Sequence, residues 1–487
     1  MKISKIREVL KETISGQVLW DEEILRYYSV DASSYQIVPK IVVIPKNESD
    51  VITVVKFAKK IKMSVTARGA ATGLVGSALN DGIIVDLRNF NAIKIGKNSV
   101  SVGSGVLKGM LDKKLEKEKK FFPPNPSVGT FCSVGGMLAN NSSGSRSLKY
   151  GSTIDNVTQI TVVDGNGKKI TLPKDHHVGS KILKVAKNIN QKKYPLVSKN
   201  SSGYRLDTVK TINHTHKAII GSEGTLGIIL KAKLKIVDIP DKRFLCVIEY
   251  DSLNDAAKNC IDVLSTLPSA IEFVDRSTLK QIPQKFSKDA KCLLFVEYDS
   301  EINKRKNQLK KIVLGKIIKQ ASKETEIKKW WRYRDSALYY SLKTIKKKKR
   351  VPHVIEDATV PAEKLGELFS LIKKTNQKFH TKSIMYGHAG NANIHVRLIS
   401  DRLDIKKIKT IAEYYVSHVI SLGGTMTGEH GDGLARSEFL KSQYGQKNYL
   451  VFHKLKKEMD PAGILNPGKK FAKKGTIIKN LESFEKN

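Results

Sequence analysis

The sequence predicts a protein of two or three domains in which helices and strands are mixed, and three observations lead to this prediction. The chain has 487 residues, whereas a domain usually takes about 100 to 200. Residues 40–68 have the pattern of a strand, a helix and a second strand. Three glycine-rich tracts precede residue 240, and together they suggest one extended ligand lying across a domain.

The strand–helix–strand unit begins with the apolar segment KIVVIP at residues 40–45. Residues 47–62 follow with helical periodicity, and Ser49 is a candidate N-cap. Residues 64–68, SVTAR, return as a strand. The three segments predict a βαβ unit.

The first glycine tract, RGAATGLVGSAL, follows this unit directly. Gly69, Gly73 and Gly76 are separated by small residues, so backbone amides can approach an anion closely. A glycine loop after a strand is often only a tight turn, and this spacing matches neither GxGxxG nor the P-loop. A Rossmann nucleotide site and an ATPase are therefore disfavoured.

Two longer tracts follow. The second, residues 123–157, is rich in Gly, Asn and Ser and too long for one turn, and a loop of that length is usually functional or disordered. Its apolar residues favour order: Phe131, Val134, Met137 and Leu138. The third, residues 221–237, is typical of a glycine turn that leads into a strand.

Two histidines lie seven residues apart in GHAGNANIH, residues 387–395. Gly387 and Gly390 disfavour a helix, and an odd separation on one strand would send the side chains to opposite faces. We therefore expect a turn between them, with His388 on a loop and His395 on the following strand. Spacing alone does not decide whether the two imidazoles converge on a metal.

The composition is ordinary for a soluble globular protein, with 40% hydrophobic and 27% charged residues, but the formal net charge is +39. Such a charge invites nucleic acid, an anionic membrane surface or acidic small molecules. The lysines are scattered, and only residues 346–350, KKKKR, form a dense run. No aromatic-basic module accompanies them, so we interpret the charge as solvated surface and expect no nucleic-acid partner.

The four cysteines are far apart and form no CxxC pair: Cys132, Cys246, Cys260 and Cys292. This spacing disfavours an iron–sulfur cluster and a disulfide framework, and it fits a reducing compartment. The N-terminus lacks the apolar run of a signal peptide, and no run of about 18 apolar residues occurs. We expect a cytoplasmic protein whose contact with a membrane, if any, is peripheral.

Seven motifs together resemble one protein family: RGAATGL, NPSVGTFCSVGGMLANNSSG, YGSTIDNV, GSEGTLG, GHAGNANIH, GEHGDG and DPAGILNPGK. Their order and approximate spacing resemble the flavoproteins of the vanillyl-alcohol oxidase and p-cresol methylhydroxylase (PCMH) superfamily. Within it, the chain is most similar to the D-lactate dehydrogenase and glycolate oxidase flavin-subunit group. The resemblance covers roughly residues 25 to 470, and many motifs in one order are far more specific than any single one.

The resemblance implies an α+β fold. Residues 1–240 would form a two-subdomain, PCMH-type FAD-binding domain, and residues 241–430 an α+β cap with an antiparallel sheet that carries the substrate site. Residues 431–475 would return to the FAD domain, and residues 476–487 would form a loose basic tail.

The resemblance also implies an extended FAD whose pyrophosphate lies on the first glycine tract. Members with covalent flavin carry a histidine in or near that loop, whereas this chain has Ala70, Ala71 and Thr72, so we expect non-covalent FAD. The alternative is that the loops are vestigial. The residues that match the flavin contacts are Arg68, Gly69, Ala70, Ala71, Thr72, Gly73, Leu74, Pro126, Ser133, Gly135, Gly136, Asn140, Ser143, Gly144, Glu223, Gly224, Gly227 and Asn466.

Metal-bearing members of the family use two histidines and a glutamate, which match His388, His395 and Glu429. These side chains suit Zn²⁺, Mn²⁺ or Fe²⁺. Asn391 and Ala392 stand where the family often has Asp and Gly, which removes a carboxylate that could orient a ligand histidine. The alternative is a metal-free polar pocket in which the histidines bind the substrate directly.

The resemblance implies oxidation of a 2-hydroxy acid, with a proton lost from the hydroxyl and a hydride delivered to flavin N5. His430 is the candidate base, although it could instead bond to a loop carbonyl. Arg334 matches the family's W-x-x-R segment and would bind the carboxylate, with Arg332 as the alternative. Ile355 stands where 2-hydroxyglutarate-specific relatives carry a lysine, which favours D-lactate or glycolate.

Electrons must then leave the flavin. The chain carries no cysteine-rich domain, so we expect a separate acceptor: an iron–sulfur subunit, a quinone or a soluble carrier. Three alternative functions remain open. They are a D-2-hydroxyglutarate dehydrogenase, a hydroxy-acid oxidase that uses oxygen, and a basic binding protein that kept a flavoprotein scaffold without turnover.

Overall fold

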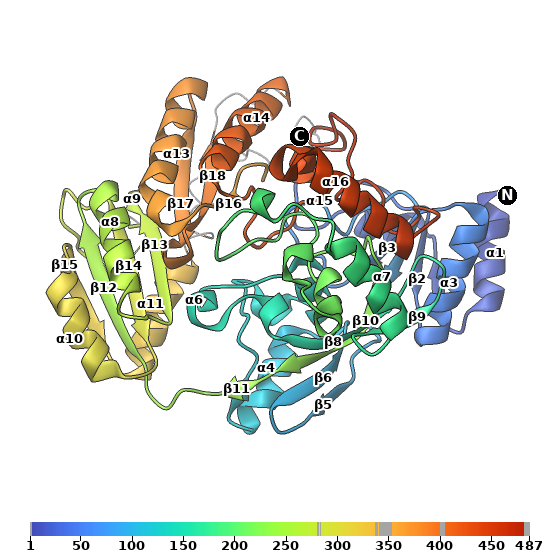
Figure 1. The fold of residues 1–487 in the computed structure, drawn as a ribbon, viewed down its shortest axis with the longest axis horizontal. Helices are drawn as coiled ribbons and strands as arrows, with labels where there is room; N and C mark the ends of the chain where they lie inside the picture. The colour runs from blue at the N-terminus through green and yellow to red at the C-terminus, as the bar shows by residue number, and fades with distance from the viewer. Residues whose placement is uncertain are drawn as a thin grey trace.

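In the computed structural model, two lobes lie side by side and a single extended segment after β11 leads from one to the other (Figure 1). The structure describes residues 2–279, 282, 284–336, 339, 353–399 and 405–481. The lysine run at residues 346–350 and the last six residues of the expected tail lie outside this part of the chain.

The first sheet has the strand order β1-β2-β4-β3, with β2, β4 and β3 parallel and β1 antiparallel to β2. Its apolar residues pack against the helix of the predicted βαβ unit, in which β4 lies between the two predicted strands. The elements are α1 (Ile3–Thr13), β1 (Gln17–Leu19), α2 (Glu22–Tyr28), β2 (Ile41–Ile44), α3 (Glu48–Ile61), β3 (Val65–Arg68) and β4 (Ile83–Asp86).

The N-cap of α3 differs from the sequence prediction. The side chain of Asn47 accepts a hydrogen bond from the backbone amide of Asp50 at 3.0 Å, and Ser49 lies inside the first turn. Both residues can cap a helix, and Asn47 takes the position because its backbone is extended there, as an N-cap requires.

The second sheet is antiparallel, with the strand order β5-β6-β10-β8-β9, and a two-stranded ribbon of β7 and β11 completes this subdomain. Its strands are β5 (Ile93–Ile95), β6 (Ser99–Gly103), β7 (Lys120–Phe121), β8 (Val157–Val163), β9 (Lys169–Leu172), β10 (Ile228–Lys235) and β11 (Val237–Asp238). Its helices are α4 (Lys108–Lys117), α5 (Val134–Asn140), α6 (Ser147–Tyr150) and α7 (His176–Ala186).

The second lobe contains a seven-stranded antiparallel sheet with the order β15-β12-β14-β13-β17-β18-β16. Its strands are β12 (Phe244–Tyr250), β13 (Ala270–Asp275), β14 (Cys292–Tyr298), β15 (Lys316–Ala321), β16 (Asp357–Thr359), β17 (Lys382–His388) and β18 (Asn393–Ile399). Its helices are α8 (Leu253–Leu264), α9 (Arg276–Leu279), α10 (Ile302–Ile312), α11 (Glu324–Asp335), α13 (Leu365–Phe379) and α14 (Ile405–Ser421). The α+β class and the antiparallel cap sheet are therefore confirmed.

Both faces of the cap sheet are covered. Along β12, Cys246 and Ile248 belong to the largest hydrophobic cluster, whereas Leu245 and Val247 belong to a separate one. This alternation follows from the two-residue period of a strand. The largest cluster also contains residues of the second sheet such as Ile160, so the two lobes share a core.

The chain ends on the first lobe. Helices α15 (Gly433–Arg436) and α16 (Leu440–Met459) lead back, and α16 crosses that lobe (Figure 1). Beyond α16, the amide of Val65 donates to Ile464 and the amide of Asn466 donates to Val65, each at 2.8 Å. The C-terminal segment thus adds to the edge of the first sheet at β3.

Candidate active site

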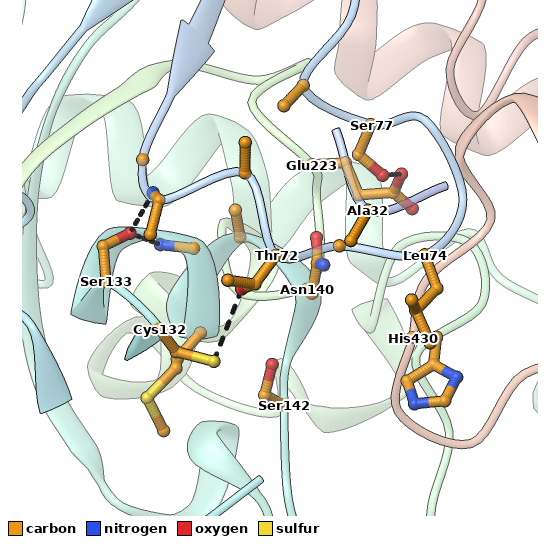
Figure 2. Close-up of a pocket in the computed structure, with 18 of the residues that line it drawn as sticks. Ala32, Thr72, Leu74, Ser77, Cys132, Ser133, Asn140, Ser142, Glu223 and His430 are labelled. Atoms are coloured by element: carbon orange, nitrogen blue, oxygen red, sulfur yellow. Dashed lines mark hydrogen bonds between the residues drawn. The ribbon is translucent and has the colours of Figure 1, made fainter. Parts of the chain in front are cut away.

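A cavity of about 520 Å³ lies where the three glycine tracts meet (Figure 2). Fifteen of the eighteen expected flavin contacts line it, and the exceptions are Ser143, Gly144 and Asn466. Residues of the cap close one end: His353, Arg397, Leu398, Glu429 and His430. Sequence reasoning missed several lining residues, among them Ala32, Ser77, Ser104 and Cys132.

The three exceptions have structural contacts instead. The hydroxyl of Ser143 donates to Glu429, and a Cβ at Gly144 would lie 2.0 Å from the carbonyl oxygen of Asn125. The side-chain amide of Asn466 donates to the carbonyl oxygens of Ser77 and Glu223 at 2.9 and 2.6 Å. Asn466 therefore holds the first and third glycine tracts together from behind the cavity.

Different structural constraints act on the glycines of the first tract. A Cβ at Gly69 would lie 2.0 Å from the hydroxyl of Ser133, so close packing within the protein excludes a side chain there. A Cβ at Gly73 would meet only the side-chain amide of Asn140, at an ordinary 3.6 Å. The protein alone does not require glycine at position 73, so the space beside it is available to a ligand.

Four consecutive backbone donors of this tract have no acceptor in the part of the chain that the structure describes. The amide of Ala70 donates to the hydroxyl of Ser133 at 3.3 Å, but within the described residues the amides of Ala71, Thr72, Gly73 and Leu74 donate to no protein atom. Unpaired backbone N–H groups beside a cavity suit an anion, and the pyrophosphate of FAD is one. The residues present therefore fit the expected cofactor.

Three imidazoles converge at the cap end of this cavity. The strand pair β17–β18 places His395 opposite Tyr386, and His388 lies two residues beyond Tyr386 on the same face. The turn expected between the histidines is a short 3-10 helix at Ala389–Asn391. His388 is the last residue of β17 and not part of the loop, which corrects the sequence prediction.

Glu429 is the centre of the cluster. Its Oε1 lies 3.1 Å from Nε2 of His388, 3.3 Å from Nε2 of His395 and 3.7 Å from Nε2 of His430. Its Oε2 accepts from the buried Nζ of Lys199 at 3.1 Å and from Ser143 at 2.5 Å. Burial raises the pKa of a carboxyl group, but the charge of Lys199 and the imidazole of His388 hold the pKa of Glu429 well below its usual range.

Carboxylates that sequence reasoning missed orient the histidines. Nδ1 of His388 lies 2.8 Å from Glu272, and Nδ1 of His430 lies 2.5 Å from Glu356. Asp357 accepts from the backbone amides of Glu429 and His430 at 3.0 and 2.8 Å, which fixes the GEHGDG loop. Acidic residues inside the otherwise apolar segments AIEFVD and VIEDATV are the signal that could have revealed them.

His430 lines the cavity, and its ring lies beside Leu74 of the first tract (Figure 2). The ring also stacks on that of His395, with centroids 4.9 Å apart. Burial by itself lowers the pKa of a histidine, but the negative charges of Asp357 and Glu356 outweigh it and raise the pKa of His430 to about 9.

The donor set fits a divalent cation. One ligand atom each of Asp357, His395, Glu429 and His430 lies within 4.8 Å of all the others. Asp357 already accepts four hydrogen bonds from the loop and from Asn393, so it suits an orienting role better than ligation. Of the expected ligands, His395 and Glu429 belong to this group and His388 does not, although its Nε2 lies 3.1 Å from Oε1 of Glu429.

Asn391 does not reach the histidines. Its side chain accepts from Ser147 at 3.0 Å and donates to Ser198 at 2.9 Å. Asn391 in place of the family's aspartate therefore does not affect the orientation of His388, because the carboxylate of Glu272 bonds to its ring. Ala392 adopts the left-handed conformation, with φ 48°, where the family often has glycine.

Arg334 lies beside the histidines in a second cavity of only about 30 Å³. Its guanidinium forms a buried ion pair with Glu272 and lies 3.5 Å from Nδ1 of His388. Arg332 on the same helix is exposed, so the alternative carboxylate ligand points away from the site. Trp331 donates to Glu297 at 2.8 Å and thus holds α11 on the cap sheet.

Comparison with known proteins agrees with this geometry. Residues 39–173 match the FAD binding domain family, and residues 239–470 match the family of FAD linked oxidases, C-terminal domain. The chain belongs to the FAD-linked oxidases. Its cofactor is FAD, and the expected resemblance to D-lactate dehydrogenase and the glycolate oxidase flavin subunit is confirmed.

Three relatives span most of this FAD-linked oxidase. Glycolate oxidase subunit GlcD of Bacillus subtilis (strain 168) is 28% identical and covers 92% of both chains. D-lactate dehydrogenase of Anaerostipes hadrus is 28% identical over 95% of this chain and 96% of its own. D-2-hydroxyglutarate dehydrogenase of Escherichia coli (strain K12) is 29% identical over 91% of this chain and 49% of its own.

Solved structures share the fold. Alkyldihydroxyacetonephosphate synthase superimposes with a TM-score of 0.68 at 18% identity, over 96% of this chain and 86% of that one. No helix among the described residues of this FAD-linked oxidase has the length and apolar character needed to cross a membrane.

Proposed function

We propose that this FAD-linked oxidase oxidises a small 2-hydroxy acid, D-lactate or glycolate, to the 2-oxo acid. One observation carries the proposal. Glu429 and His430 line the FAD cavity and also the small cavity that contains His388 and His395. A substrate in the small cavity would therefore lie between the histidine cluster and the flavin.

His430 is the proposed base for the substrate hydroxyl. Its Nδ1 is held by Glu356, and its Nε2 faces Oε1 of Glu429, so the ring has a fixed orientation beside the cavity. A base must be within hydrogen-bond reach of its proton, and only the neutral imidazole accepts it, so the raised pKa of His430, about 9, predicts turnover that increases as the pH rises toward 9. FAD, when bound, accepts the hydride from C2 of the hydroxy acid.

The size of the small cavity supports a small substrate. About 30 Å³ is available beside the histidines before any side chain moves. Ile355 belongs to the hydrophobic core and lines neither cavity, so its position gives no support to a role in substrate choice. The small cavity alone favours a two- or three-carbon acid over 2-hydroxyglutarate.

His388, His395 and Glu429 would hold the divalent cation. A cation at this position lowers the pKa of a bound hydroxyl and binds the adjacent carboxylate. Glu272 orients His388 for this role, while Lys199 fixes the second oxygen of Glu429. The chain's own residues thus orient the donors.

We propose that the electrons pass to a separate acceptor, since the two matched domains supply a flavin site alone. A dye-linked assay tests the proposal without knowledge of that acceptor. The purified protein with FAD is assayed with D-lactate, glycolate, L-lactate and D-2-hydroxyglutarate as donors and a redox dye as acceptor. Turnover with D-lactate or glycolate, lost in His430→Ala, is expected, whereas turnover with none of the four would exclude this substrate class.

A further inference from the structure

Arg397 lies at the junction of the two cavities and lines both. It follows His395 by two residues on β18, so both side chains lie on the same face of the strand. The residue is 6% exposed. A long cationic side chain is thus buried between the flavin cavity and the histidine cluster.

Two nitrogens of the Arg397 guanidinium are not satisfied by the part of the chain that the structure describes. Its Nε and Nη1 are buried and have no hydrogen-bond partner there. The guanidinium forms an ion pair with Glu356, but Oε2 of Glu356 lies 3.7 Å from Nη2, beyond hydrogen-bond distance. Oε2 of Glu356 also lacks a partner, while Oε1 is bound by His430 and Arg436.

The other buried arginines of the site differ from Arg397. Arg436 donates to the carbonyl oxygens of Gly431, His353 and Val354 as well as to Glu356. Arg334 forms a buried ion pair with Glu272, and only its Nε lacks a hydrogen-bond partner among the described residues. A buried charge without acceptors costs free energy, so an arginine kept in this state points to an acceptor that arrives with a ligand.

We propose that Arg397, rather than Arg334, receives the carboxylate of the substrate. The proposal rests on the function proposed above and names the residue that selects an acid. Arginine offers two parallel N–H donors that match a carboxylate, either Nε with Nη2 or Nη1 with Nη2, and each of these forks in Arg397 contains one of the two unpaired nitrogens. Glu356 lies between Arg397 and the proposed base. Its Oε1 contacts His430, and its Oε2 faces Arg397.

The test uses the FAD-loaded protein and three variants. Arg397→Met removes the charge, and Arg397→Lys keeps the charge without the fork. Arg332→Met removes a charge from the exposed face of α11 and is the matched control. The oxidised flavin spectrum is titrated with pyruvate, the product of D-lactate oxidation, which occupies the site without turnover.

Arg397→Met is expected to weaken pyruvate binding about 100-fold or more, as the loss of two charge-assisted hydrogen bonds implies. Arg397→Lys should bind with intermediate affinity, and Arg332→Met should bind as the unaltered protein does. With D-lactate, the KM of Arg397→Met should rise by more than its kcat falls. Unchanged pyruvate affinity in Arg397→Met would overturn the proposal.

Thermal unfolding separates this role from a structural one. Because Nε and Nη1 of Arg397 have no hydrogen-bond partner among the described residues, Arg397→Met should unfold without ligand at the same temperature as the unaltered protein or higher. A lower unfolding temperature together with loss of FAD would show that the residue holds the fold, and would also overturn the proposal.

The outcomes also distinguish this inference from the proposed function. If no hydroxy acid reduces the flavin but carboxylate binding still depends on Arg397, the proposed function fails and the anion site stands. If D-lactate reduces the flavin with the same KM in Arg397→Met, the function stands and the inference fails.

Discussion

Replacing Gly73 by valine tests whether FAD, and not the protein, requires glycine in the first tract. The backbone there is not left-handed, and a Cβ would meet only Asn140 at 3.6 Å, so the apoprotein should accept the larger side chain. In the FAD complex the three added carbons would enter the space of the cofactor. Overpacking of this kind costs about 1 to 3 kcal/mol, which corresponds to a Kd for FAD raised about 5- to 140-fold.

The assay is a titration of apoprotein with FAD, followed by quenching of flavin fluorescence, with thermal unfolding measured in parallel. Gly69→Ala is the contrasting variant, because its Cβ would lie 2.0 Å from the hydroxyl of Ser133 and should lower the unfolding temperature of the apoprotein. Gly73→Val should unfold near the temperature of the unaltered apoprotein. If Gly73→Val binds FAD with unchanged affinity, the cavity is not where FAD lies.

Three further predictions concern buried charges. Burial lowers the pKa of His216 to about 4, against about 6.5 in an unfolded chain, so its contribution to stability is complete above pH 6.5 and is lost as the pH falls toward 4. In urea unfolding, acidification to pH 4.5 should lower the free energy of unfolding of His216→Gln by roughly 2 to 3 kcal/mol less than that of the unaltered protein. Equal losses in the two proteins would refute this. Lys199→Met leaves the charge of Glu429 uncompensated. Mn²⁺ should therefore raise the unfolding temperature of this variant more than that of the unaltered protein. Equal shifts of the unfolding temperature would argue against a cation at Glu429. Arg146→Met removes the bidentate partner of the fully buried Glu297, whose two oxygens lie 2.6 and 2.8 Å from the guanidinium. This change should lower the free energy of unfolding by about 3 to 5 kcal/mol in a denaturant titration. A loss below about 1 kcal/mol would contradict the buried pairing.

Local patterns in the sequence predicted the elements better than their arrangement. The apolar run at residues 41–44 and the helical period after it gave β2 and α3 correctly. That β4 lies between β2 and β3 depends on pairing over long sequence distances, which no local period encodes. The N-cap of α3 is Asn47 and not the predicted Ser49, because both residue types can cap a helix and only the backbone conformation separates them.

The site shows the same limit. Spacing could not decide whether His388 and His395 converge, because the answer lies in the register that pairs His395 with Tyr386. The W-x-x-R motif indicates Arg334 as the carboxylate ligand, yet the structure pairs Arg334 with Glu272 and leaves Nε and Nη1 of Arg397 without a hydrogen bond among the described residues. Which arginine is satisfied depends on carboxylates from other strands, and their positions follow from the folded sheet alone.

The most direct test of the proposed chemistry is the visible spectrum of the FAD-loaded protein under anaerobic conditions, before and after addition of D-lactate, with glycolate and L-lactate in parallel. A flavin that accepts the hydride of the substrate loses its absorbance near 450 nm, as flavins do on reduction. The account predicts this loss with D-lactate or glycolate and its absence in His430→Ala. A flavin spectrum that none of these acids changes would contradict the proposed chemistry while leaving the FAD-binding fold in place.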